Sequence, residues 1–183
     1  MKDEQLRIVA AAGLVIGALL GMAGTFTPSP ALRGLAWGVD GVALVVASAL
    51  LSVHYHRRGD ATLAAGFLVF LAGETLIVSG SAVELAASAP TFAAGAGLWS
   101  AALALVSAAP VMPRLVRLTG AIAAILFAVT AAQMFSGGGL TPLSQPLPFY
   151  GYPFLAATLF GWAWAHSRPT PVLRRQAGEG ASS

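Results

Sequence analysis

The chain has 183 residues, of which 57% are hydrophobic and only 9% are charged, and its formal net charge is +3. Soluble domains carry about 25% charged residues, so this composition excludes a protein whose whole surface faces water. The sequence contains no cysteine, which excludes disulfides and thiolate metal sites. The excess of arginine is explained by membrane topology, and we expect no nucleic-acid partner.

Six long apolar segments predict six transmembrane helices. Each segment is close to the roughly 20 residues that a helix needs to cross about 30 Å of hydrocarbon, and a helix satisfies its own backbone in lipid. In chain order the segments are Leu6–Phe26, Leu35–Val53, Ala61–Val83, Phe92–Ala109, Leu115–Phe135 and Leu147–Ala165. We therefore predict an all-α membrane protein with a transmembrane domain over residues 1–166 and a flexible cytoplasmic tail over residues 167–183.

The basic residues predict the orientation of these spans. With six crossings, all but one of the ten Lys and Arg residues fall on one side of the membrane, and Arg33 alone falls on the other. Basic residues gather in cytoplasmic loops, so both termini are predicted to be cytoplasmic. We expect a multi-pass protein of a bacterial inner membrane. The residues on the cytoplasmic side are Lys2, Arg7, Arg57, Arg58, Arg114, Arg117, Arg168, Arg174 and Arg175.

The sixth segment is irregular because Pro148 and Pro153 both lie near its outer end. Pro153 either starts a short helix or kinks a longer one. The preceding stretch, Leu140–Pro148, has no apolar periodicity, and we interpret it as an ordered outer loop. It leads to Tyr150, which is expected at the depth of the membrane interface.

Small residues suggest an internal repeat of three helical hairpins of about 54 residues each, an arrangement related to the parallel repeats of some transporters. The first helix of each hairpin carries a small pair, namely Ala12-Gly13, Ala65-Gly66 and Thr119-Gly120. The alternative is chance, because such matches arise easily in a chain rich in glycine and alanine. Gly13, Gly17 and Gly21 recur every four residues, which predicts close packing against another helix.

Glu74 is the one acidic residue deep inside a predicted span. A charge at the centre of a span costs about 2.5–3.5 kcal/mol on insertion scales, and no Lys or Arg is expected at a similar depth. One hypothesis is that Glu74 lines a water-filled cavity and binds a proton or a cation. The alternative is a neutral carboxylic acid that ties helices together by a hydrogen bond.

Four further polar side chains are predicted to share the outer half of the membrane with Glu74. We assign Asp40, Ser81, Gln133 and Tyr150, together with Glu74, to a ligand or ion pathway. Asp40 has two alternative roles, because it could simply reach the membrane interface or complement the N-terminus of its helix behind Trp37 and Gly38.

Three histidines close predicted spans on the cytoplasmic side. His54, His56 and His166 lie beside arginines, and we interpret them as interfacial anchors rather than ligands of a haem or a metal ion. Nucleotide, phosphate-loop, zinc-protease and nucleophile-elbow patterns do not occur in the sequence. We therefore expect no cofactor and no bound metal.

These features favour a carrier or channel for a small solute or ion, with Glu74 as its key polar group. The alternative is a non-catalytic membrane module, such as a subunit, an assembly factor or a lipid-binding partner of a larger complex. A third and less favoured hypothesis is an intramembrane enzyme that uses Glu74 and Asp40 as an acid–base pair. The lipid bilayer is the expected partner, and a homo-oligomer or a membrane complex is left open.

Overall fold

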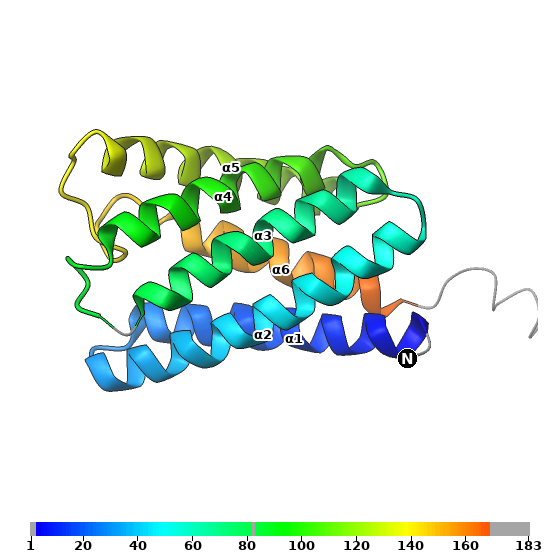
Figure 1. Cartoon of the computed structure of the whole chain (residues 1–183), viewed down its shortest axis with the longest axis horizontal. Helices are drawn as coiled ribbons and strands as arrows, with labels where there is room; N and C mark the ends of the chain where they lie inside the picture. Colours follow the sequence, from blue (N-terminus) through cyan, green and yellow to red (C-terminus); the bar gives the residue numbers. More distant parts are fainter. Residues whose placement is uncertain (1–2, 82, 169–183) are drawn as a thin grey trace, which may run out of the picture.

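The computed structural model describes residues 3–81 and 83–168, and within that part the chain is a bundle of six helices (Figure 1). From residue 169 onward, the predicted cytoplasmic tail lies outside the described residues. The helices are α1 (Asp3–Phe26), α2 (Pro30–Arg57), α3 (Ala61–Gly80), α4 (Ala89–Ala108), α5 (Arg114–Phe135) and α6 (Gly151–Ser167). Among the described residues, α1 to α5 are long and apolar enough to cross a membrane.

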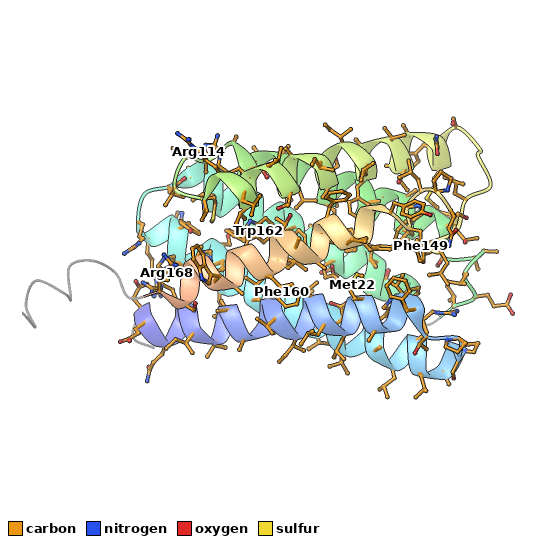
Figure 2. The ribbon with its side chains drawn as sticks, turned by 180° about the vertical axis from the view of Figure 1, so that it is seen from behind. Met22, Arg114, Phe149, Phe160, Trp162 and Arg168 are labelled. Carbon is orange, nitrogen blue, oxygen red and sulfur yellow. The ribbon has the colours of Figure 1, made fainter. Side chains whose placement is uncertain are left out.

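The helices form a closed ring. Each helix contacts the one before it and the one after it, and α6 returns to contact α1. In Figure 2, which views the bundle from behind, α6 runs between α1 and α5. The interior is filled by buried aromatic side chains, namely Phe67, Phe70, Trp99, Phe127 and Trp162.

The two ends of the bundle differ in charge. We call the end with Asp3, Arg57 and Ser167 the proximal end, and the end with Phe26, Pro30 and Gly151 the distal end. Of the described basic residues, all except Arg33 belong to the proximal end. Figure 2 shows Arg114 and Arg168 at the proximal end and Phe149 at the distal end.

Local signals set the start of α2 earlier than predicted. The Ser29 side chain accepts a hydrogen bond from the Leu32 backbone N–H at 3.4 Å, and Pro30 occupies the first helical position. Both features favour a helix start, because Pro has no N–H to leave unpaired there. The predicted start at Leu35 was therefore late by five residues, since apolar character begins later than the helix.

The irregular sixth segment forms a shorter helix than predicted. α6 begins at Gly151 rather than Leu147 and has 17 residues, a length of about 25 Å. Pro153 lies in its first turn, where its missing N–H leaves no helical hydrogen bond unmade. The first of the two predicted alternatives, a short helix started near Pro153, is thus confirmed.

Candidate ligand-binding cavity

A cavity of about 410 Å³ lies in the distal half of the bundle, between α1, α2, α3, α4 and α6. It reaches from exposed residues at the distal end, such as Pro30 and Glu84, to Asp40 and Glu74 inside the bundle. Its volume is within the range of about 300–1,000 Å³ that is typical of small-molecule sites. Its lining is mostly apolar, with a small number of polar side chains.

Asp40 lies inside the bundle at this cavity, and one of its carboxyl oxygen atoms lacks a partner among the described residues. Its side chain lies ten residues after Pro30, about 15 Å along α2, and is 9% exposed. Its Oδ1 atom is buried and has no hydrogen-bond partner among the described residues. The alternative in which Asp40 complements the start of its helix is therefore wrong, because α2 begins almost three turns earlier.

Two glycines of α1 leave room for the Asp40 carboxyl group. A Cβ atom at Gly21 would lie 2.8 Å from Asp40 Oδ2, and one at Gly17 would lie 3.1 Å from Asp40 Oδ1. Side chains at these positions would displace the carboxyl group. The glycines at every fourth position of α1, which predicted close helix packing, therefore also make room for the acidic part of the cavity.

Glu74 lies behind Asp40 at the closed end of the cavity and is 1% exposed. Trp99 of α4 donates a hydrogen bond from Nε1 to Glu74 Oε2 at 3.1 Å. A Cβ atom at Gly41, the residue after Asp40, would lie 3.2 Å from Glu74 Oε1. The two carboxyl groups come from neighbouring helices, α2 and α3, and line the same cavity. Trp99 is a site residue that the sequence analysis did not select, and the signal that could have found it is an indole N–H within an apolar span, which needs a buried acceptor.

The distal mouth of the cavity carries Arg33, which sequence reasoning used only for topology. Its guanidinium donates a hydrogen bond to the Thr27 carbonyl oxygen at 2.8 Å and lies 5.9 Å from the centre of the Trp37 ring. Its Nε atom is buried and has no partner among the described residues. The signal that could have identified Arg33 is its isolation on a side with no other Lys or Arg.

The structure brings three of the five predicted pathway residues together. Asp40, Glu74 and Ser81 line the cavity, and Ser81 donates from Oγ to the Val78 carbonyl oxygen at 2.7 Å. Gln133 and Tyr150 are exposed and are not part of the lining.

Tyr152 lines the cavity in place of its neighbour Tyr150. Its hydroxyl group donates to the Pro142 carbonyl oxygen at 2.7 Å, which joins α6 to the preceding loop. The sequence could not distinguish the two tyrosines, because the start of α6 decides which of them faces inward.

A second polar cluster lies at the proximal end, and it corrects the prediction of interfacial histidines. His54 and His166 are 2% and 4% exposed, whereas His56 is exposed. His54 Nδ1 lies 2.7 Å from Asp3 Oδ1. Interfacial anchoring is therefore wrong for His54 and His166, because the pairing of α1, α2 and α6 encloses both rings. We call the cluster of Asp3, Arg7, His54, Tyr55 and His166 the proximal network.

Hydrogen bonds in the proximal network define the proton positions on His166. Its Nδ1 lies 2.6 Å from the Trp162 carbonyl oxygen and therefore donates, so its Nε2 accepts from the Tyr55 hydroxyl group at 2.8 Å. Arg7 donates from Nε to the His166 carbonyl oxygen at 3.1 Å and also donates to the Arg168 carbonyl oxygen. The network thus joins α1, α2 and α6.

Aromatic rings fill the space between the proximal network and the cavity. Tyr55 stacks on Phe67 with ring centres 5.7 Å apart, and Phe67 meets Trp162 edge to face at 5.1 Å. Phe70 contacts Trp162 at 5.6 Å and stacks on Trp99 at 5.9 Å. This aromatic column runs from Tyr55 to the indole that holds Glu74, and it separates the cavity from the proximal end.

Comparison of the chain with protein-family models, with curated proteins and with solved structures finds no match.

Proposed function

We propose that this protein is a small membrane carrier or channel for a small solute or ion, with the distal cavity as its binding site. The observation that carries the proposal is the buried, unpartnered Oδ1 of Asp40 beside a second acid, Glu74. Burying a carboxyl group without a hydrogen-bond partner is costly, and acids inside membrane bundles mark ion and substrate pathways. A bound ligand would supply the missing partner.

The closed proximal end favours a carrier over an open channel. Ligand would enter from the distal end and reach Asp40, while the aromatic column and the proximal network block the other end. Carriers alternate access around a fixed site by moving one group of helices against another. A state of this protein that opens toward the proximal end requires the hydrogen bonds of α1 and α2 with α6 to break, because those bonds close the proximal end.

Binding is favoured over catalysis by a serine or threonine nucleophile at this site. The Ser and Thr hydroxyl groups among the described lining residues each donate to a carbonyl oxygen of their own segment. Thr25 donates to Gly21 at 2.8 Å, Ser81 to Val78 at 2.7 Å, and Ser88 to Leu85 at 2.8 Å. A nucleophile would instead need its proton directed at a neighbouring base.

We infer that α6 crosses the membrane as the sixth span and that both termini are cytoplasmic. The basic proximal end then faces the cytoplasm of a bacterial inner membrane, and the cavity opens outward. A repeat of three hairpins would pair α1 with α2, α3 with α4 and α5 with α6, and these pairs are in contact.

A separate observation favours the alternative of a membrane module. An apolar groove runs between α1 and α2 on the outside of the bundle, and its floor contains Gly13, Gly34 and Gly38. Small residues allow a further helix to approach closely, whether from another subunit or from a second copy. This groove does not use the acids, so the two functions predict different effects of changing them.

Flux measurements on purified protein in liposomes test the carrier or channel proposal. We expect movement of protons, cations or a small solute that Asp40→Asn and Glu74→Gln abolish. Glu4→Gln is the matched control, because it removes an exposed acid at the opposite end. Absence of any flux, with purification at a fixed ratio to other membrane subunits, would replace the proposal with the module.

A further inference from the structure

The charges around the cavity indicate the charge of its ligand. Asp40, Glu74 and Glu84 line it, and Arg33 is the one basic side chain among its described lining residues. Arg33 already donates to the Thr27 carbonyl oxygen and lies over Trp37. Among the described residues neither Asp40 nor Glu74 forms an ion pair with a basic side chain, so a positive ligand complements them best.

The walls of the cavity argue against a bare inorganic ion. Calcium binds through six to eight oxygen atoms, and magnesium keeps an octahedral shell of oxygens and water. The inner walls instead carry apolar groups such as Leu44, Ile77 and Phe92. A volume of about 410 Å³ is also far larger than one ion needs. The walls therefore suit a ligand with an apolar body.

An aromatic residue, Trp37, lines the same cavity as the unpartnered carboxyl group of Asp40. Trp37 and Asp40 are three residues apart on α2, which places them on one face of the helix. Both lie near Gly21, because Trp37 Nε1 donates to its carbonyl oxygen at 3.3 Å and a Cβ atom at Gly21 would lie 2.8 Å from Asp40 Oδ2. A carboxyl group next to an indole is the arrangement that recognises ammonium groups.

We propose that the cavity binds a small organic ammonium cation with an apolar body, and that its positive group lies at Asp40. Glu74, held by Trp99, supplies a second carboxyl group behind Asp40. Transport of this cation rests on the function proposed above, whereas its binding does not.

Isothermal titration calorimetry on the full chain in detergent micelles tests the binding. Benzyltrimethylammonium is the probe, because its charge is permanent and its ring supplies the apolar body. Phenylacetate and benzyl alcohol have the same ring with a negative charge or none, so they control for partition into the micelle. We expect saturable binding of benzyltrimethylammonium at one site and no saturable binding of the other two.

Two variants locate the site. Asp40→Asn should weaken the binding of benzyltrimethylammonium at least about tenfold, because a charge-assisted contact is lost. Glu4→Gln changes the same charge at an exposed proximal position and should leave affinity unchanged. Equal binding of phenylacetate, or unchanged affinity in Asp40→Asn, would overturn the proposal.

A measurement on the unaltered chain covers the case in which Asp40→Asn does not fold. Dicyclohexylcarbodiimide modifies carboxyl groups in apolar surroundings, and mass spectrometry locates the adduct. Benzyltrimethylammonium should protect Asp40 from modification, and phenylacetate should not. Modification that proceeds equally with and without the cation would also contradict the proposal.

Binding and transport measured on the same protein distinguish a failure of the cation site from a failure of the carrier. If the protein binds benzyltrimethylammonium at Asp40 but liposomes pass neither this cation nor protons nor another solute, the carrier fails and the cation site stands. If they transport protons or another solute but show no site for the cation, the carrier stands and the cation site is wrong.

Discussion

At the scale of the residue, Glu74 is held inside the bundle by a single directional contact with Trp99. Its other neighbours include the backbone around Gly41, where the absence of a side chain leaves room for Oε1. The indole N–H satisfies one oxygen atom of the carboxyl group, so the cost of burial is reduced without a cationic partner.

The contact with Trp99 predicts different effects for two substitutions at position 74. Glu74→Gln retains an oxygen acceptor for the Trp99 N–H, so unfolding temperature in detergent should change little while proton- or cation-coupled flux is abolished. Glu74→Ala leaves the indole N–H unpaired and should lower the free energy of unfolding by about 1–3 kcal/mol. Equal destabilisation by both substitutions would contradict the assigned hydrogen bond.

At the scale of the element, α1 and α2 approach each other through glycines. A Cβ atom at Gly13 would lie 2.9 Å from the Ala43 carbonyl oxygen and 3.0 Å from Ala47 Cβ. Since the first of these atoms belongs to the backbone, a larger residue requires the helices to move apart.

This contact predicts that Gly13→Ala is destabilising, by about 1–3 kcal/mol, as expected for overpacking. Gly38→Ala is the matched control, because no atom lies within 4 Å of the Cβ position and alanine favours the helix by up to about 1 kcal/mol. Unfolding in detergent measures both variants. A Gly13→Ala protein as stable as Gly38→Ala would show that the two helices are further apart.

The proximal network is the other contact between elements on which the proposal depends. Tyr55 on α2 donates to His166 on α6, and Arg7 on α1 donates to the carbonyl oxygen of the same histidine. These bonds connect helices that are far apart in sequence, and they close the end of the bundle opposite the cavity.

Tyr55→Phe removes one of these bonds while keeping the aromatic contact with Phe67. Hydrogen bonds between transmembrane helices average about 0.6 kcal/mol and reach about 1.7 kcal/mol, so a loss in this range is expected. The exposed His56 supplies the control, since His56→Ala should leave stability unchanged. If unfolding shows no difference between the two variants, the bond between Tyr55 and His166 is absent in solution.

At the scale of the whole molecule, the alternation of the helices places the described basic residues, except Arg33, at the proximal end. The distal end carries the mouth of the cavity. The direction in which the cavity opens is therefore tied to the orientation of the protein in the membrane.

Cysteine labelling tests this orientation, because the natural chain contains no cysteine. An impermeant thiol reagent added outside intact cells should label Ser136→Cys, in the loop after α5, and should not label Arg57→Cys, at the end of α2. Both positions are exposed in the structure. Labelling of Arg57→Cys from outside would reverse the orientation and direct the cavity toward the cytoplasm.

The sequence by itself determined the helical class and the approximate position of every helix. Apolar character over about 20 residues is a local property that lipid enforces, since the bilayer cannot satisfy free backbone groups. The same reasoning selected Glu74 and Asp40, because charge is rare in apolar segments. It misjudged the ends of α2 and α6, where capping and proline chemistry outweigh hydropathy.

The tertiary structure decided which polar groups meet. Trp99 reaches Glu74 across 25 residues, and Tyr55 reaches His166 across 111, through helix contacts that local pattern does not encode. Helix rotation decided that Tyr152 lines the cavity while Tyr150 is exposed. The physical reason is that a span in lipid is apolar on every face, so hydropathy fixes its depth but leaves its rotation to packing against its neighbours.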